Sequence, residues 1–210
     1  MNRIILQSGE SPDQGNQGIV DWGTPQELFD GLDELHGPFE LDAAASVVNH
    51  KCSMFYTEAD DGLSQDWGGL NVFVNPPYGK KALGEWIEKG YSESTRPGTK
   101  VTMLIRASIE RPCFWRWCFG IPPRYTSGPH RAIGDPARDL SVPTGTAKYI
   151  HPIDGRLKFV GPSTDGATFV ALVVVFEYPG VWTPVVQYID RHGRLLCPNF
   201  SKNSYASPGQ

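Results

Sequence analysis

The chain has 210 residues, a formal net charge of −4, 40% hydrophobic residues and 20% charged residues, which is typical of one soluble globular domain with a full core. Its longest apolar run, residues 169–176, is too short for a membrane-spanning helix, and residues 1–9 hold only three consecutive apolar residues, too few for a signal peptide. We therefore expect a cytoplasmic protein without a membrane partner.

The charge is unevenly distributed along the chain. Residues 1–110 carry 8 basic and 17 acidic residues, a net −9, whereas residues 111–158 carry 8 basic and 3 acidic residues, a net +5. A nucleic-acid surface needs concentrated positive charge more than a high overall pI. Residues 111–158 are therefore predicted to form a nucleic-acid-facing segment.

The composition predicts one domain between two tails. Residues 1–20 are rich in Gln, Gly, Ser and Asp and indicate a flexible arm, residues 21–196 form the domain, and residues 197–210 form a tail. The four cysteines (Cys52, Cys113, Cys118 and Cys197) contain no CxxC pair, so we expect reduced thiols and assign no metal.

The domain opens with a helix. Thr24-Pro25-Gln26-Glu27 has the pattern of a capping box with proline at the first helical position. Leu28, Leu32 and Leu35 mark one buried face, and Gly37-Pro38 ends the helix. Exposed NH groups at a helix start favour anions, so residues 24–25 are candidates for binding one.

Two short strands are expected next, at residues 39–45 and 52–57, with an acidic loop at 58–63. Asp42 stands where the first strand gives way to small residues, a pattern typical of a ligand site at the carboxyl end of a strand. A capping aspartate in a turn is the alternative for Asp42, and a solvated loop is the alternative for residues 58–63. Only about thirty residues separate Asp42 from Asn75, which leaves room for little or no helix between the first strands.

Residues 71–79, Asn-Val-Phe-Val-Asn-Pro-Pro-Tyr-Gly, predict a strand buried on both faces that ends in a rigid polar tip. Proline lacks an NH for the sheet, and a residue before proline is held extended, so Asn75 and Pro76 keep free acceptors. The Asn75 side-chain oxygen and the Pro76 carbonyl can each accept one hydrogen of an exocyclic amine, whose lone pair is then aimed outward. Tyr78 can stack on the ring, and a base in a duplex would have to be flipped out. A rigid turn after a core strand is the alternative.

The second half predicts a helix at 80–92 with Trp86 in the core, a buried strand at 101–105 and a helical aromatic segment at 114–119. Residues 120–150 show neither period and indicate a long loop. Strands at 156–160 and 167–178 are expected to form an antiparallel edge hairpin, and residues 181–196 a small terminal ribbon. The basic candidates for contacting nucleic acid are Arg124, Arg131, Arg138 and Lys148.

Five motifs, in order, resemble the phage DNA adenine-N6 methyltransferase (Dam-type) family: Trp22-Gly23-Thr24-Pro25, residues 39–44, Asp61-Gly62-Leu63 with Asp66-Trp67, Asn75-Pro76-Pro77-Tyr78 and residues 155–159. The resemblance covers roughly residues 20–178. It implies an α/β fold with a Rossmann-like methyltransferase sheet, S-adenosylmethionine as cofactor, DNA as partner and adenine N6 as methyl acceptor. We expect a monomer or a weak homodimer.

The resemblance also assigns roles to residues. Asn75, Pro76, Pro77 and Tyr78 would be catalytic, and the cofactor would be held by Trp22, Thr24, Pro25, Asp42, Ala43, Glu58 and Asp61. Within that set, Thr24-Pro25 would hold the methionine carboxylate, Glu58 would face the ribose and Asp61 would accept from the adenine amine. One departure is that the glycine-rich loop common to methyltransferases is Asp42-Ala43-Ala44-Ala45-Ser46 here.

Two other functions stay open at this stage. Asn-Pro-Pro-Tyr also occurs in enzymes that methylate RNA bases or protein glutamine side chains, and the basic segment does not separate RNA from DNA. The missing glycines are also compatible with a non-catalytic DNA-binding protein on a degenerate methyltransferase scaffold. Binding of S-adenosylmethionine separates this last possibility from the enzymes.

Overall fold

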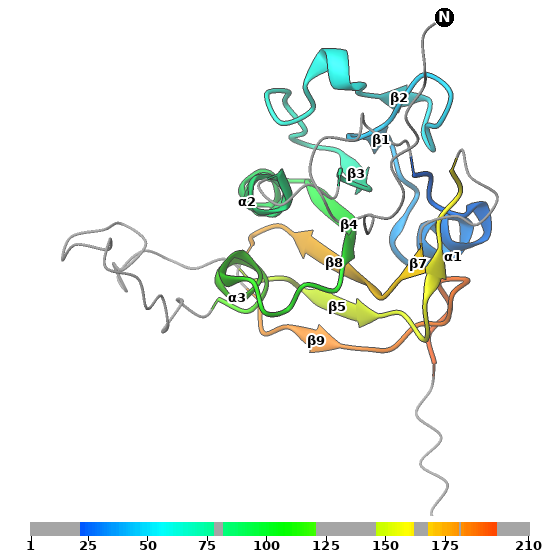
Figure 1. The fold of residues 1–210 in the computed structure, drawn as a ribbon. Coiled ribbons are helices and arrows are strands. Elements are labelled where there is room, and N and C mark those ends of the chain that lie inside the picture. The colour runs from blue at the N-terminus through cyan, green and yellow to red at the C-terminus, as the bar shows by residue number, and fades with distance from the viewer. Residues whose placement is uncertain (1–21, 78–81, 121–145, 162–167, 181, 197–210) are drawn as a thin grey trace, which may run out of the picture.

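A computed structural model describes residues 22–77, 82–120, 146–161, 168–180 and 182–196. Within these residues, a central sheet has the strand order β2 (Met54–Phe55), β1 (Leu41–Asp42), β3 (Asn71–Val74), β4 (Lys100–Arg106), β8 (Ala171–Glu177), β5 (Tyr149–Pro152) and β9 (Val185–Val186) (Figure 1). The first four strands are parallel, β8 is antiparallel to both neighbours, and β9 is parallel to β5. A separate antiparallel pair consists of β6 (Leu157–Lys158) and β7 (Thr168–Phe169).

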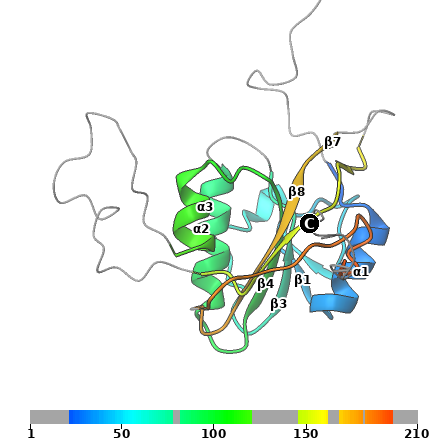
Figure 2. The same cartoon turned by 90° about the horizontal axis from the view of Figure 1, so that it is seen from below.

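Helices cover both faces of the sheet, as Figure 2 shows: α1 (Gln26–His36) lies on one face, and α2 (Ala82–Ser94) and α3 (Pro112–Cys118) lie on the other. The alternation of side chains along β3 connects these two layers, because Val72 and Val74 pack with α2 and α3 while Phe73 packs with α1. All three are at most 1% exposed. The predicted strand buried on both faces is confirmed.

The connections between the first strands are short, as expected from the sequence. Between β1, β2 and β3 the only helical element is one 3₁₀ turn, η1 (Glu58–Asp60), within a stretch that the structure describes completely. The mixed α/β class is confirmed. None of the helices in the described part of the chain is long and apolar enough to cross a membrane.

The predicted edge hairpin is wrong in its placement. The strand expected at 167–178 divides into β7 and β8, and β8 lies inside the sheet between β4 and β5 rather than at its edge. Residues 171–176 are all buried, which requires a strand covered by neighbours on both faces. The strand β5 was missed, because its four residues include a histidine and a proline and follow a long polar segment.

The predicted capping box at the start of α1 is also wrong. The residue before the helix is Pro25, and no side chain caps the first turn. Thr24 is buried, and its side chain does not cap the NH groups of the first helical turn. The helix itself and its buried Leu28 and Leu32 are confirmed, whereas Leu35 is only partly buried.

Two buried histidines connect the end of α1 to β5. The Nε2 atoms of His36 and His151 are 2.9 Å apart, and His151 Nδ1 is 3.0 Å from the carbonyl oxygen of Gln187. A carbonyl only accepts, so Nδ1 of His151 carries its proton and its Nε2 accepts from His36. Burial, with the neighbouring His151, lowers the pKa of His36 to about 3, and burial also lowers the pKa of His151.

Because the pKa values of His36 and His151 are lowered in the folded protein, we expect the protein to lose stability in acid. The unfolded histidine binds a proton below its ordinary pKa of 6.5 while folded His36 stays neutral, so stability is present above pH 6.5 and is lost as the pH falls. We expect His36 to account for about 2 kcal/mol of lost unfolding free energy between pH 7 and pH 5. Denaturant unfolding at both pH values tests this.

His36→Gln keeps a donor for His151 and should flatten the pH dependence. Burial raises the pKa of Asp42 to about 6, which acts in the opposite direction over part of this range. Asp42 is present in both proteins, so the difference between wild type and His36→Gln reports on the His36–His151 pair. Equal losses in these two proteins would contradict the assignment.

Candidate active site

The predicted site residues converge on the carboxyl edge of the parallel strands. Strands β2, β1, β3 and β4 are parallel, so their carboxyl ends share one edge of the sheet. Asp42 ends β1 and is the register partner of both Phe55 and Phe73. Asn75 lies two residues beyond Phe73, at the point where ligands bind in open α/β sheets.

The side chain of Asn75 is held by the backbone before α1. Its Nδ2 donates to the carbonyl oxygen of Trp22 at 3.0 Å. This bond turns Oδ1 to the opposite side of the amide group, which is the acceptor that the sequence predicted for an amine. Pro76 is buried and Pro77 is exposed, while Tyr78 lies outside the described residues.

The Trp22 carbonyl is itself fixed by a second contact. Gly23 and Val160 exchange two backbone hydrogen bonds, of 2.6 and 2.9 Å. The Trp22 ring covers Gly161, where a Cβ would lie 2.1 Å from the Trp22 Cε3 atom. The sequence did not predict these partners, because a backbone carbonyl has no sequence signature. The two glycines are the only signals that could have indicated them.

The orientation of α1 brings its first turn to the same edge. The helix follows Trp22 and Thr24, next to Asn75, and at its other end the carbonyl of His36 accepts from Asn71 Nδ2 at 2.9 Å. Asn71 opens β3 and Asn75 follows its end, so α1 begins at the carboxyl edge. Its first NH groups have no side-chain cap, which is compatible with an anion there.

Asp42 is 3% exposed, and its carboxylate closes its own loop. Its Oδ2 accepts from the NH of Lys51 at 2.9 Å, and its Oδ1 accepts from the NH of Ala44 at 3.4 Å. Burial raises the pKa of Asp42 to about 6, and the two NH groups offset only part of that effect. The turn-capping alternative is therefore present in the structure, and contact of Asp42 with a ligand stays a prediction.

The acidic loop has three carboxylates, all exposed to solvent, of which one bonds the neighbouring Thr57. Asp60 accepts from Thr57 through the backbone NH at 2.8 Å and the hydroxyl at 2.6 Å, so it caps η1. Asp61 has a left-handed backbone, with φ of 52°, and its carboxylate bonds no other residue in the described part of the chain. Glu58 is exposed. Strained backbone of this kind is concentrated at functional sites.

Close packing places this loop against β1. A Cβ on Gly62 would lie 2.1 Å from the carbonyl oxygen of Ala43, so only glycine lets the two backbones approach. The Gly62 carbonyl accepts from Trp67 Nε1 at 2.9 Å, and the Trp67 ring stacks on Trp86 of α2 at 6.0 Å. Asp61 is thereby held next to the carboxyl end of β1.

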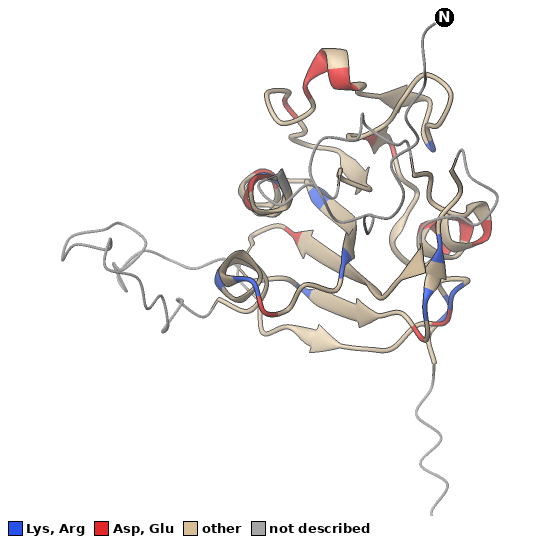
Figure 3. Cartoon of the chain, in the orientation of Figure 1, with Lys and Arg blue, Asp and Glu red and all other residues tan. Residues whose placement is uncertain are grey.

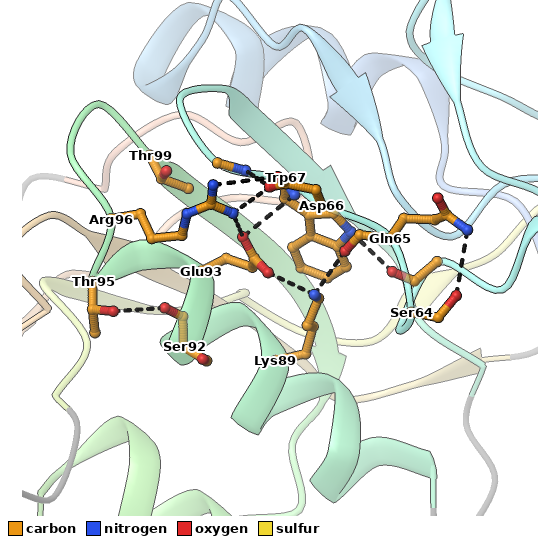
Figure 4. Close-up of polar contacts among 12 residues, drawn as sticks. Ser64, Gln65, Asp66, Trp67, Lys89, Ser92, Glu93, Thr95, Arg96 and Thr99 are labelled. Carbon is orange, nitrogen blue, oxygen red and sulfur yellow. Dashed lines mark hydrogen bonds and ion pairs between the residues drawn. The ribbon is translucent and has the colours of Figure 1, made fainter.

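A charged network anchors the end of this loop to α2 (Figure 4). Buried Glu93 accepts from Lys89 Nζ at 2.5 Å and from Arg96 at 2.9 Å, and it also accepts from the NH of Trp67 at 3.3 Å. Lys89 Nζ donates to the Gln65 carbonyl at 2.7 Å. Residues 65–67 are therefore tied to α2, the helix that follows β3 and Asn75 in the chain.

The predicted nucleic-acid contacts are described only in part. Arg124, Arg131 and Arg138 lie outside the described residues. Lys148 pairs with Glu177 at 2.9 Å and lies over the ring of Trp182 at 4.6 Å, so it has partners within the fold. Figure 3 shows acidic residues, coloured red, on η1 and α1. The carboxyl edge of the sheet therefore carries negative charge near η1 and α1, and these parts of it do not attract phosphate.

Residues 16–118 match the family described as DNA N-6-adenine-methyltransferase (Dam). The chain is 40% identical over 63 residues to the putative methyltransferase YfdM of Escherichia coli (strain K12), a match that covers 27% of this chain and 69% of that protein. The chain belongs to the Dam family. This finding confirms the resemblance of its motifs, and the matched residues include Asp42, Asn75 and the acidic loop.

Two relatives in this family are named DNA N-6-adenine-methyltransferase. The protein of Escherichia phage T1 is 33% identical over 87 residues, 41% of this chain and 35% of that protein. The protein of Haemophilus phage HP1 (strain HP1c1) is 29% identical over 85 residues, 40% of this chain and 48% of that protein. The chain therefore matches about a third of one phage protein and about half of the other.

The Gly62 contact generates a prediction about the site. Gly62→Ala forces the acidic loop away from Ala43 and should lower the unfolding free energy by about 1 to 3 kcal/mol, the usual cost of overpacking. Gly84→Ala is the control, because a Cβ there meets Cys113 at an ordinary 3.7 Å. Gly84 is the third residue of α2, where alanine should stabilise the protein by up to about 1 kcal/mol. Thermal unfolding compares them, and equal effects would contradict the close approach.

Proposed function

We propose that this protein transfers a methyl group from S-adenosylmethionine to the N6 amine of adenine in DNA. Membership of the Dam family and the names of its phage relatives support this function. The observation that carries it is the hydrogen bond from Asn75 Nδ2 to the Trp22 carbonyl, which fixes the catalytic amide at the carboxyl edge of the sheet. We interpret the fold as a Rossmann-like methyltransferase sheet, with residues 111–158 as a DNA-facing insertion.

The proposed role of the tip is to orient the amine. Asn75 Oδ1 and the Pro76 carbonyl accept the two amino hydrogens, which aims the nitrogen lone pair outward and stabilises positive charge developing on the nitrogen. Because Asn75 is held before the substrate arrives, little reorganisation is needed during the reaction. Stacking by Tyr78 completes the pocket for the flipped base. The proton leaves to water afterwards, so no general base is required.

The residues around the edge fit S-adenosylmethionine, which supplies an electrophilic methyl group on a sulfonium when bound. The uncapped first turn of α1, next to Trp22, Thr24 and Pro25, offers NH groups to a carboxylate. Asp61 and Glu58 offer carboxylates to donors, and Gly62, the residue after Asp61, packs on the carbonyl of Ala43. This donor set matches a ligand that has both an anionic group and several hydrogen-bond donors.

The proposal for DNA binding rests on charge. Arg124, Arg131 and Arg138 belong to the segment with a net charge of +5. We propose that they contact phosphates, which would make affinity fall steeply with salt. The role of Lys148 is weaker in this proposal, because its ion pair with Glu177 would have to open before it could contact DNA.

The two asparagines of the β3 segment provide a direct test of catalysis. Asn75→Ala should lower turnover on DNA by at least about a hundredfold, the scale of losing one preorganised polar group at a developing charge. Asn71→Ala, at the other end of the strand, should lower stability and leave the turnover of the folded protein near wild type, because its amide bonds only the backbone of residues 36 and 38. The measurement is N6-methyladenine in digested DNA by mass spectrometry. Near-normal turnover of Asn75→Ala would refute the catalytic role.

Two neighbouring aspartates test the cofactor site. Asp61→Gly tolerates the left-handed backbone and removes a carboxylate that bonds none of the described residues, so S-adenosylmethionine should bind at least about tenfold more weakly with stability unchanged. Asp60→Ala removes the capping-box partner of Thr57 and should lower the unfolding temperature slightly with little change in binding. Calorimetric titration and thermal unfolding measure both. Unchanged binding by Asp61→Gly would move the cofactor site elsewhere.

A further inference from the structure

The turn that follows β1 exposes two valines at its tip. Val47 is 74% exposed and Val48 is 91% exposed. The turn is firmly built: the backbones of Ser46 and Asn49 exchange hydrogen bonds of 3.0 and 3.2 Å, and the NH of Asn49 also contacts Ser46 Oγ at 3.1 Å. Two adjacent branched apolar side chains are thus presented to water on a fixed turn.

Two contacts fix this tip relative to the catalytic asparagine. The Asp42 carboxylate bonds the NH groups of Ala44 and Lys51, which closes the loop at its base. The Asn49 side chain lies against Gly23, where a Cβ would be 2.9 Å from its amide atoms. Gly23 follows Trp22, whose carbonyl holds Asn75. The valine tip is therefore connected to Asn75, at the proposed site of methyl transfer, through Asn49, Gly23 and Trp22.

The charge around the tip indicates which part of DNA it meets. The acidic loop with Glu58, Asp60 and Asp61 belongs to the same edge and repels phosphate, whereas Val47 and Val48 are uncharged. Adenine N6 lies inside the duplex, so its base has to leave the stack, and apolar side chains inserted between bases stabilise such openings. The apolar tip therefore suits the interior of a base stack better than the phosphate backbone of DNA.

We propose that Val47 and Val48 enter the duplex beside the target adenine and fill the space that it leaves. This inference rests on the proposed function. Asp42 then acts as a positioning residue as well, because its two backbone contacts determine where the tip stands. The role is separate from catalysis: the valines lower the cost of opening the duplex and do not touch the reacting atoms.

The test compares two DNA duplexes of random sequence. One is intact, and in the other a fraction of the thymines has been removed to leave abasic sites, so that adenines opposite them are already unpaired. The double variant Val47→Ser/Val48→Ser should lose about tenfold in turnover on the intact duplex and stay within about twofold of wild type on the abasic duplex. Val47→Ile/Val48→Ile should keep wild-type turnover on both.

The control is Val185→Ser/Val186→Ser on β9, where the two valines are 45% and 49% exposed at the far edge of the sheet. It should match wild type on both duplexes. The inference is overturned if the Val47/Val48 serine variant keeps intact-duplex turnover within twofold of wild type. It is also overturned if turnover falls equally on both duplexes or S-adenosylmethionine binding weakens, since the turn would then serve the cofactor site. A wild-type protein inactive on both duplexes would instead refute the proposed function.

Discussion

The hydrogen bond between Asn75 Nδ2 and the Trp22 carbonyl is the interaction on which the arrangement of the site depends. It joins residues 53 positions apart and connects the end of β3 to the start of α1. Because α1 covers one face of the sheet and Gly23 pairs with Val160, the same short segment aligns the end of β3, the start of α1 and the residues after β6. The Asn75 amide is held by a backbone carbonyl, which cannot rotate away as a side chain can.

The compact first half of the sheet has a functional consequence. With one 3₁₀ turn and no longer helix between β1, β2 and β3, the loops at their carboxyl ends pack directly on one another. Gly62 allows the acidic loop to touch Ala43, and the Glu93 network holds its end against α2. The site is thus preorganised from both sides, which is the requirement for electrostatic stabilisation of a developing charge.

Asp42 fits two interpretations, a ligand-binding carboxylate and a carboxylate that caps its own turn. Its position at the end of β1 is that of a ligand-binding carboxylate, yet its oxygens already accept from Ala44 and Lys51. Burial raises its pKa to about 6, so the folded protein pays for keeping it ionised at neutral pH. A carboxylate held in this way organises residues 42–51, and the exposed Asp61 is better placed to accept from a new donor.

The sequence by itself determined most of the local elements, the order of the motifs and the family. Val72 to Val74 and Asn75-Pro76 predict a buried strand with a rigid tip, and the short spacing from Asp42 excludes a helix before it. Periodicity and proline sterics act within a few residues, so they can be read directly.

Only the tertiary structure decided which parts meet. The place of β8 inside the sheet, the strand β5, the partner of Lys148 and the Trp22 carbonyl all depend on long-range pairing of backbone groups. Every residue except proline carries the same NH and carbonyl, so the sequence contains no signal for a particular partner. The positions of Gly23 and Val48 relative to Asn75 follow from the same pairing, and for that reason they emerge only when the chain is folded.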